Sequence, residues 1–421
     1  MDRLPGFRDF YPDPPPQPDL WSADARQYIF EKWRTTARCY GFREYDGPPL
    51  EPLELFTTKS GEEIVGQLYN FTDKGRREIA LRPEMTPTLA RMVAAHERSY
   101  KKPIKWFTMP QLFRYERQQK GRLREHFQLN ADILGEPGTG ADAELIALLI
   151  DTLRAFNLTS EDFVIRLSSR NAWHQFFTAR KADPSKEYEF YQIIDKLERE
   201  QQQQSEEKLQ RLGFSMAEVN SFIEKGEPTA QLASILESLA ARGLKDFVRV
   251  DYHVIRGLAY YTGVVLEAFD KKGEFRAIAG GGRYDNLVKL VSGGKVDLPA
   301  LGFGMGDVVL LELLRARGLL PQFEAGIEVF VLIEDESLRP QSLQLVQTLR
   351  SEHISVEYAL AATKPDKQFK RAQELKAKYV ARILPGEPPS VAIRNLKTRE
   401  EASISPLEVL ERIKQPTKSR S

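Results

Sequence analysis

Side chains suited to binding phosphate are concentrated in the stretch Phe113–Gln128, whose sequence is FRYERQQKGRLREHFQ. Five of its residues are basic, namely Arg114, Arg117, Lys120, Arg122 and Arg124. An arginine guanidinium can form two parallel hydrogen bonds with a phosphate group, which a lysine ammonium cannot. The stretch therefore suits a nucleoside triphosphate and the end of a nucleic acid, although a solvated hairpin with a charged edge would share this composition.

The elements that must position these side chains are predicted to be strands. One strand is expected over Trp106–Tyr115 and another over Phe127–Leu134, with a polar loop around Gln118–Gly121 between them. Further strands are predicted where β-branched and aromatic residues gather, at Val164–Ser169, Phe247–Tyr252, Val264–Phe269 and Phe275–Gly280. Short connections after residue 247 favour antiparallel pairing. We therefore expect an α+β domain with a mostly antiparallel sheet covered by helices.

Two changes of pattern divide the chain. Residues 170–245 are rich in Glu, Lys and Gln, with apolar residues at helical spacing, and indicate a small helical insertion within a domain spanning residues 1–322. In residues 326–421, strands and helices alternate, which predicts a second domain with a partly parallel sheet. Basic residues outnumber acidic ones between Lys364 and Glu400. They could hold an RNA by its phosphates, or belong to a solvated helix face.

Composition places further bounds on the protein. A chain of 421 residues exceeds one typical core, so two or three domains are expected. The formal net charge is only +1, so any surface for a nucleic acid must be local. The single cysteine, Cys39, excludes an intramolecular disulfide, and the five histidines lack the spacing of a zinc site. Without an apolar run of membrane or signal length, we expect a cytoplasmic protein and no membrane contact.

Six segments, in order along the chain, resemble those of the class II aminoacyl-tRNA synthetases, and specifically the histidyl-tRNA synthetases. FRxE and the basic loop after it resemble motif 2. The other segments are LPGFRDFYPD (Leu4–Asp13), GFREYDGPPLEPLELF (Gly41–Phe56, motif 1), LRPEMT (Leu81–Thr86), RGLAYYTG (Arg256–Gly263) and GGGRYD (Gly280–Asp285). Each motif alone is weak, whereas the ordered set covers nearly the whole chain. The resemblance implies a class II catalytic domain followed by an anticodon-binding domain.

The resemblance also implies a reaction, the activation of L-histidine with ATP and its transfer to histidine tRNA. The amino-acid carboxylate attacks the α-phosphate, so positive charge must be fixed where negative charge grows in the transition state. The resemblance assigns this catalytic role to Arg114 and Arg256, the adenine amino group to Glu116 and the nucleotide phosphates to Arg122. Mg²⁺ is expected with ATP, although no protein ligand for it can be assigned from spacing.

Recognition of histidine requires partners for both ring nitrogens and for the amino group. The residues that the resemblance assigns to histidine binding are Glu84, Met85, Thr86, Arg114, Gln128, Asp132, Arg256, Tyr260 and Tyr261. The tyrosines could instead pack in a core, and Gly280–Gly282 could form a turn. Contact with the tRNA acceptor end is implied for Arg117, Gln119 and Lys120. Of these, Gln119 is expected to contact a base, since glutamine can both donate and accept hydrogen bonds.

Three positions depart from the family pattern. Ala259 stands where the family has Asp in RGLDYY, Asp132 where Glu is common, and Val309 where motif 3 has an arginine for the terminal phosphates. Arg315 lies on a different helix face and is a poor substitute. The missing guanidinium leaves open a paralogue without aminoacylation, such as the regulatory subunit of ATP phosphoribosyltransferase, or a protein that only binds RNA. The QQKGR loop and the C-terminal domain, both tRNA-facing in the family, favour the ligase.

Motif 1 implies a symmetric homodimer, because its helix and strand form the subunit interface in the family. Leu50, Leu53, Leu55 and Phe56 would supply apolar surface to that interface, although they would serve a core equally well.

Overall fold

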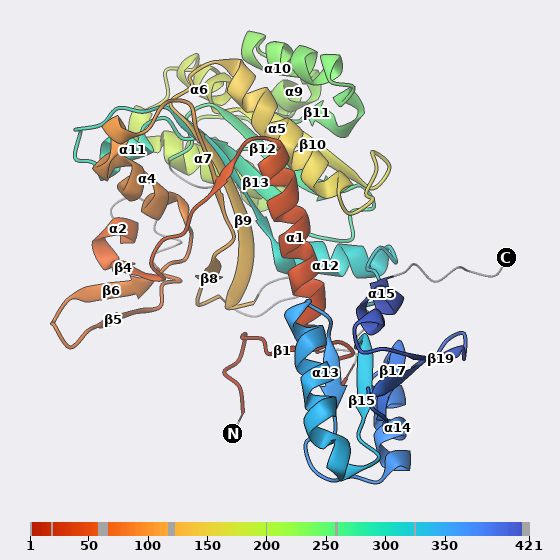
Figure 1. The fold of residues 1–421 in the computed structure, drawn as a ribbon. Coiled ribbons are helices and arrows are strands. Elements are labelled where there is room, and N and C mark those ends of the chain that lie inside the picture. The colour runs from red at the N-terminus through yellow and green to blue at the C-terminus, as the bar shows by residue number, and fades with distance from the viewer. Residues whose placement is uncertain are drawn as a thin grey trace. The chain divides into compact units, whose positions relative to one another are not determined.

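The computed structural model describes residues 2–17, 20–57, 66–116, 123–198, 200–256, 260–323 and 326–414. The chain forms two compact units (Figure 1). Unit 1 comprises Met1–Phe10 and Ala23–Pro321, and unit 2 comprises Tyr11–Ser22 and Gln322–Ser421.

A mixed, mostly antiparallel sheet is the centre of unit 1. Its strands follow the order β11-β10-β12-β13-β14-β9-β7-β3, and β8 pairs separately with β9. Only the outer pairs β10–β11 and β3–β7 are parallel. The bounds are β3 Arg43–Glu44, β7 Ile104–Thr108, β8 Gln111–Phe113, β9 Glu125–Leu134, β10 Phe163–Ser169, β11 Val248–Val250, β12 Val264–Asp270, β13 Ala279–Arg283 and β14 Ala300–Gly306. The predicted sheet class is confirmed.

Helices cover this sheet. Helix α5 (Thr139–Arg154) packs against β9 and β14 and also contacts α1 (Ala23–Cys39) and α10 (Ala230–Ala241) (Figure 1). Because α5 has neighbours on several sides, nearly its whole circumference is apolar. Helix α12 (Asp307–Ala316) begins directly after β14 and packs against β9 and β14.

A small three-stranded sheet lies at one edge of unit 1, where Figure 1 shows it with α2 and α4. Its strands are β4 Leu50–Pro52, β5 Asn70–Thr72 and β6 Glu78–Leu81. The helices of this region are α2 Leu53–Thr57, α4 Thr86–Ala95, η1 Glu97–Ser99 and α11 Leu287–Val291, and α11 packs on α4. Leu50 is 40% exposed, whereas Phe56 is fully buried in the core of this sheet.

The insertion is helical, as predicted. It contains α6 Arg170–Thr178, η2 Pro184–Lys186, α7 Glu187–Lys196, α8 Gln202–Arg211, α9 Met216–Lys225 and α10, with η3 Lys245–Phe247 leading back into the sheet. A cluster of aromatic rings fills its centre, namely Trp173, Phe176, Phe190, Phe214 and Phe222. At the start of α9, Ser215 and Glu218 form a reciprocal capping box, which satisfies exposed backbone N–H groups.

Unit 2 contains a five-stranded sheet in the order β16-β15-β17-β18-β19. Its first two pairs are parallel and its last two antiparallel, as the alternating pattern predicted. The bounds are β15 Val329–Leu332, η4 Glu336–Leu338, α13 Arg339–Ser351, β16 Val356–Tyr358, α14 Pro365–Glu374, β17 Tyr379–Leu384, β18 Ser390–Asn395, β19 Glu401–Ile404 and α15 Glu408–Lys414. Two short strands, β1 Phe10–Tyr11 and β2 Trp21–Ser22, form a separate ladder.

Several strand boundaries differ from the sequence predictions. The strand expected over Trp106–Tyr115 is divided into β7 and β8, because Pro110 between them lacks the N–H that a ladder needs. The strand expected over Phe275–Gly280 begins only at Ala279. In the described part of the chain, each helix is too short or too polar to cross a bilayer.

Candidate active site

A cavity opens over strands β9, β13 and β14 of unit 1. Its lining includes eight of the nine residues predicted to bind histidine, namely Glu84, Thr86, Arg114, Gln128, Asp132, Arg256, Tyr260 and Tyr261. These residues come from segments far apart in the sequence, so the fold brings the separate motifs together at one place. We refer to this hollow as the first cavity.

Glycines on β13 and β14 make room for the functional side chains. A Cβ atom at Gly302 would lie 1.9 Å from Asp132 Oδ1, and one at Gly304 would lie 2.7 Å from the amide of Gln128. At Gly280 a Cβ would lie 2.4 Å from Arg256 Nη1. Because real Cβ atoms do not approach other atoms so closely, these glycines are required for the side chains to occupy the cavity as they do.

Asp132 is one of the two buried carboxylates that line the first cavity. Its side chain is buried, and Tyr284 donates its hydroxyl to Asp132 Oδ1 at 2.5 Å. Burial raises the pKa of Asp132 to about 7, although the tyrosine hydrogen bond acts in the opposite direction. This acid therefore changes charge near neutral pH. Tyr284 belongs to GGGRYD but was not singled out from the sequence.

Glu84 and Tyr260 form a second buried pair. The tyrosine hydroxyl donates to Glu84 Oε2 at 2.8 Å, and both side chains are largely removed from solvent. Burial, followed by the neighbouring charge of Glu84, raises the pKa of Tyr260 well above its usual value. The pair thus keeps its proton on tyrosine, so the carboxylate is available to accept a hydrogen bond from a cationic amino group.

Arg256 lies across the first cavity, with its side chain 25% exposed. Its Nη1 donates to Glu267 Oε1 on β12. Burial works against the charged form, but Glu267 outweighs it and raises the pKa of Arg256 above its ordinary value. Arg256 therefore presents a permanent positive charge to the cavity. Glu267 was not predicted as a site residue, since a lone acid within a strand carries no motif signal.

A second cavity adjoins Arg114. Its lining residues are Arg114, Glu116, Leu123, His126, Gly306, Val308 and Val309. Arg114 therefore lines both cavities, and its Nε is held by the carbonyl oxygen of Pro83 at 2.9 Å. Val309, which stands where the family pattern has a phosphate-binding arginine, lines this cavity, and Arg315 is exposed near the other end of α12.

His126 supplies no positive charge to the second cavity. Burial, with Arg114 and Arg8 nearby, lowers the pKa of His126 to about 3. The imidazole is therefore neutral at physiological pH. Arg114 is the cationic side chain of this lining within the described residues, which restricts how an anion can be held there.

Next in sequence to His126 and Gly306 of the second cavity are Glu125 and Asp307, two members of an ion triad that sequence reasoning missed. Arg8 donates its Nε to Glu125 Oε1 at 2.6 Å and its Nη1 to Asp307 Oδ2 at 2.8 Å. Asp307 also accepts the backbone N–H of Phe127 at 3.0 Å. The triad fixes the N-terminal segment, the start of β9 and the start of α12 to one another. No local pattern could reveal it, because Arg8 and Asp307 are separated by almost 300 residues in sequence.

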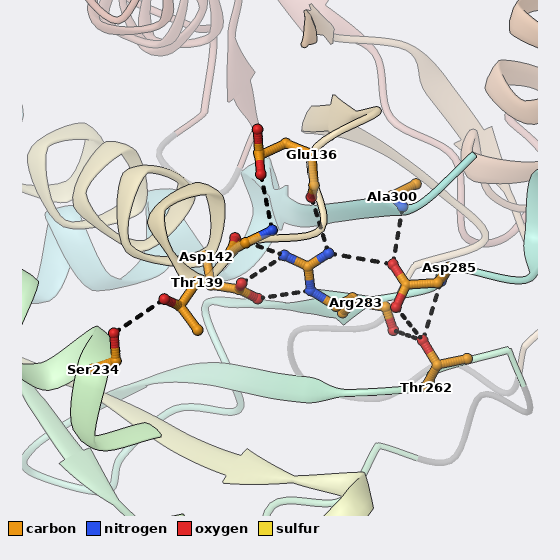
Figure 2. A network of polar contacts seen from close by, with 9 residues as sticks. Glu136, Thr139, Asp142, Ser234, Thr262, Arg283, Asp285 and Ala300 are labelled. Atoms are coloured by element: carbon orange, nitrogen blue, oxygen red, sulfur yellow. Dashed lines mark hydrogen bonds and ion pairs between the residues drawn. The ribbon is translucent and has the colours of Figure 1, made fainter. Parts of the chain in front are cut away.

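A second buried arginine, Arg283, holds the GGGRYD segment in place, as Figure 2 shows. Its Nη2 donates to Asp142 Oδ2 at 2.6 Å, and its Nη1 donates to the carbonyl oxygen of Glu136 at 3.1 Å. Thr262 is joined to the same segment, since its hydroxyl donates to Asp285 Oδ2 at 3.2 Å. The network connects β13, which carries Gly280 and is followed directly by Tyr284, with the segment that carries Tyr260 and Tyr261.

Some predicted site residues are not in either lining. The side chain of Met85 is fully buried, and its sulfur accepts from Arg82 Nη1 at 3.9 Å. The structure thus places Met85 in the core rather than in the first cavity. Four predicted site residues lie outside the described residues, namely Arg117, Gln119, Lys120 and Arg122. Ala259, which departs from the family pattern, also lies outside them.

Across the described ranges, His, Cys, Asp and Glu side chains do not gather in groups of three or more that could hold a metal ion. Two carboxylates near the second cavity, Glu125 and Asp307, are already engaged by Arg8. These side chains therefore do not form a ready cage for Mg²⁺, which commonly takes its ligands from nucleotide phosphates and water.

Comparison with known proteins gives a family match in each unit. A model described as histidyl-tRNA synthetase matches residues 18–307, and one described as anticodon binding domain matches residues 328–416. A histidine–tRNA ligase of Opitutus terrae is 45% identical, with 95% of each chain covered. Another, from Leptospira biflexa, is 37% identical over 97% of this chain and 96% of the relative.

Solved structures agree on the fold. The crystal structure of histidyl-tRNA synthetase from Nostoc sp. PCC 7120 has a TM-score of 0.73 at 22% identity, covering 93% of this chain and 95% of that one. Of the functions weighed from the sequence, the relatives favour the ligase over the regulatory subunit.

Proposed function

The chain belongs to the histidyl-tRNA synthetase family, and on this premise we propose how its cavities carry out the ligation of histidine to tRNA. The first cavity binds L-histidine, and the second binds the adenosine and phosphates of ATP. The reaction begins with attack of the histidine carboxylate on the α-phosphate, which releases pyrophosphate and leaves histidyl-adenylate. A hydroxyl at the 3′ end of histidine tRNA then attacks the acyl carbon of histidyl-adenylate and accepts the histidyl group, and AMP is released.

The observation that carries this proposal is the position of Arg114, which lines both cavities. The two anions that must react would meet at its guanidinium, while Arg256 lies in the first cavity. Two fixed cations stabilise the charge that grows on the phosphate oxygens, and they need not reorganise during the reaction. The bonds from Arg114 to Pro83 and from Arg256 to Glu267 hold these groups ready.

The same cavity offers polar partners for each part of histidine. Glu84 receives the α-amino group, Arg114 the carboxylate, and Asp132 an imidazole nitrogen. A buried carboxylate left without a partner is costly, so analogues that lack a ring N–H are rejected. Glu116, in the second cavity, accepts from the adenine amino group.

The remaining parts of the proposal concern substrates and partners. Arg117, Gln119 and Lys120 contact the acceptor end of the tRNA, Arg122 contacts the nucleotide phosphates, and unit 2 binds the anticodon stem. Mg²⁺ accompanies ATP and is held mainly by its phosphates. We propose that the protein acts in the cytoplasm as a symmetric homodimer, which sedimentation equilibrium would test through the mass in solution.

The deciding experiment is histidine-dependent exchange of labelled pyrophosphate into ATP. We expect exchange in the wild type, and a loss of about 100-fold or more in Arg114→Ala and in Arg256→Ala, since each removes a fixed charge from the transition state. Arg242→Ala is the matched control, because Arg242 is an arginine paired with Glu144 away from both cavities.

Absence of pyrophosphate exchange would contradict the proposed function. A folded wild-type protein without exchange would exclude amino-acid activation. Capture of an ATP phosphoribosyltransferase by the tagged chain would then identify the regulatory function instead.

A further inference from the structure

The backbone of Arg256 adopts an uncommon conformation that another residue holds in place. Its φ angle is +61°, in the left-handed region that non-glycine residues seldom occupy. Arg170 donates its Nη2 to the carbonyl oxygen of Arg256 at 2.8 Å. The side chain of Arg170 is thus directed at the peptide unit whose conformation decides where the Arg256 guanidinium points.

Arg170 also binds the other end of the same segment. Its backbone N–H donates to the carbonyl oxygen of Gly263 at 2.9 Å. One residue therefore holds both ends of residues 256–263, the segment that carries Arg256, Tyr260 and Tyr261. Strand pairing brings these two places together, because Ser169, directly before Arg170, pairs in β10 with Val264 of β12, directly after Gly263.

Arg170 is the first residue of α6, where the helical insertion begins. Its guanidinium lies 4.3 Å from the centre of the Tyr191 ring, on α7 of the insertion. Arg170 is 5% exposed, and burial lowers its pKa although Tyr191 and Asp195 act in the opposite direction. A desolvated guanidinium makes a stronger hydrogen bond than a hydrated one, which favours a firm hold on the carbonyl oxygen.

We propose that Arg170 is a positioning residue for amino-acid activation, and that through it the helical insertion fixes the geometry of Arg256. The inference rests on the proposed function of Arg256 and extends it. Arg170 lines neither cavity and is not required to touch a substrate. Its effect is on where the Arg256 charge lies when the transition state forms.

This role predicts a division between rate and binding. Misplacing a catalytic group by about 1 Å can cost on the order of 100-fold in rate. In histidine-dependent pyrophosphate exchange, we expect Arg170→Ala to lower kcat by about 10- to 100-fold, with KM for histidine and for ATP changed by no more than about threefold. Tyr191→Leu, which removes the ring beneath the guanidinium, is expected to give a smaller loss in the same direction.

Arg180→Ala is the matched control. Arg180 also belongs to the insertion, lies 3.8 Å from the centre of an aromatic ring, that of Phe176, and donates to the Phe176 carbonyl oxygen at 2.9 Å. It has the same kind of stacking and the same kind of hydrogen bond as Arg170, but without the link to Arg256. We expect the kcat of Arg180→Ala to equal that of the wild type.

A double-mutant cycle separates positioning from general stability. If Arg170 acts through Arg256, then Arg170→Ala added to Arg256→Ala should lower exchange by less than about twofold further. A purely structural role predicts that Arg170→Ala lowers exchange by the same factor in the wild type and in Arg256→Ala, and this result would overturn the proposal. A kcat in Arg170→Ala equal to that of the wild type would also overturn it. If Arg170→Ala does not fold, the same cycle with Tyr191→Leu decides by the same criterion. Absence of exchange in the wild type would instead reject the proposed function, and this inference with it.

Discussion

The titration of Asp132 couples charge in the first cavity to pH. Burial raises the pKa of Asp132 to about 7 in the folded protein, far above the value of about 4 for an exposed aspartate. Between these two values the folded chain holds more protons than the unfolded chain, so the free energy of unfolding falls as pH rises. The ionised Asp132 therefore lowers the free energy of unfolding by its full amount above about pH 7, and this penalty is absent below about pH 4.

We therefore expect Asp132→Asn to become more stable relative to the wild type as pH rises from 4.5 to 7.5, by roughly 2–4 kcal/mol across that range. The amide is nearly the same size and can still accept the Tyr284 hydrogen bond, so the comparison isolates the charge. Urea unfolding of both proteins at several pH values would measure the difference. A difference that stays flat with pH would show that Asp132 titrates normally.

Val309 offers a test at the second cavity. Its side chain lines the same hollow as Arg114, so Val309→Arg would place a new guanidinium where the phosphates are proposed to bind. A charge-assisted hydrogen bond contributes about 1.5 kcal/mol, which corresponds to a decrease of about tenfold in the KM for ATP. Initial rates of exchange at varied ATP would show this, with KM for histidine unchanged as the internal control. An increase in the KM for ATP would mean that another group already occupies that space.

Individual residues differed in how far the sequence could identify them. Arg114, Arg256 and Asp132 were found because each lies in a segment with a recognisable order of neighbours, and all three line the first cavity. Arg170 acts through a partner 86 residues away, and Glu267 is a lone acid within a strand, so no motif marks either residue. Arg8 lies in the LPGFRDFYPD segment, but its pairing with Glu125, 117 residues away, cannot be read from that segment. Met85 was assigned by its place between Glu84 and Thr86, but at the start of α4 its side chain turns into the core.

At the scale of elements, the Arg8 triad joins the N-terminal segment, β9 and α12. Its carboxylates, Glu125 and Asp307, are 1% and 5% exposed, so neither is well hydrated without the arginine. Removing one partner of such a buried group costs about 3–5 kcal/mol, because it leaves an uncompensated charge. We expect Arg8→Met to lose that much stability at pH 7.5 by urea unfolding.

The pH dependence and a compensating variant test the cause of this loss. Burial already raises the pKa of Asp307 even with Arg8 present, so without the arginine Asp307 should take up a proton more readily. The deficit of Arg8→Met should then shrink as pH falls. The triple variant Arg8→Met/Glu125→Gln/Asp307→Asn should recover most of the stability at pH 7.5. Failure to recover would attribute the loss to packing of the arginine stem instead.

Elements were predictable where one strong pattern covers their whole length. The alternation of apolar and polar residues in β9 and the helical spacing of the insertion both gave the correct element type. Strand β13 was misplaced because its residues, AGGGR, have low strand propensity, and pairing with β12 and β14 determines the strand instead. The glycine-rich strand that makes room for Arg256 is therefore the element that local propensity describes least well.

At the scale of the whole molecule, the proposed substrate contacts divide between the two units. Both cavities lie in unit 1, while the anticodon-binding match falls in unit 2. Unit 2 also includes Tyr11–Ser22, so its chain is not continuous and a cut near residue 322 would not isolate it. Point substitutions are therefore a cleaner way than truncation to separate the functions of the units.

Helix α14 of unit 2 provides such substitutions. Lys367 and Lys370 are exposed on this helix, within the stretch where basic residues outnumber acidic ones. If they contact tRNA phosphates, Lys367→Glu/Lys370→Glu should raise the KM for tRNA in aminoacylation by about tenfold or more, and leave histidine-dependent pyrophosphate exchange unchanged. Each lost phosphate contact should also reduce the slope of log affinity against log salt by about one.

The matched control is Lys271→Glu/Lys272→Glu, which makes the same change in net charge at two exposed lysines just after β12 in unit 1. A general electrostatic effect on tRNA association would appear in both double variants, whereas direct contact by α14 would appear only in the first. Aminoacylation measured at several salt concentrations distinguishes these cases. Equal KM values and equal salt slopes in the two variants would assign the basic residues of α14 to a solvated helix face, the alternative that their charge alone leaves open.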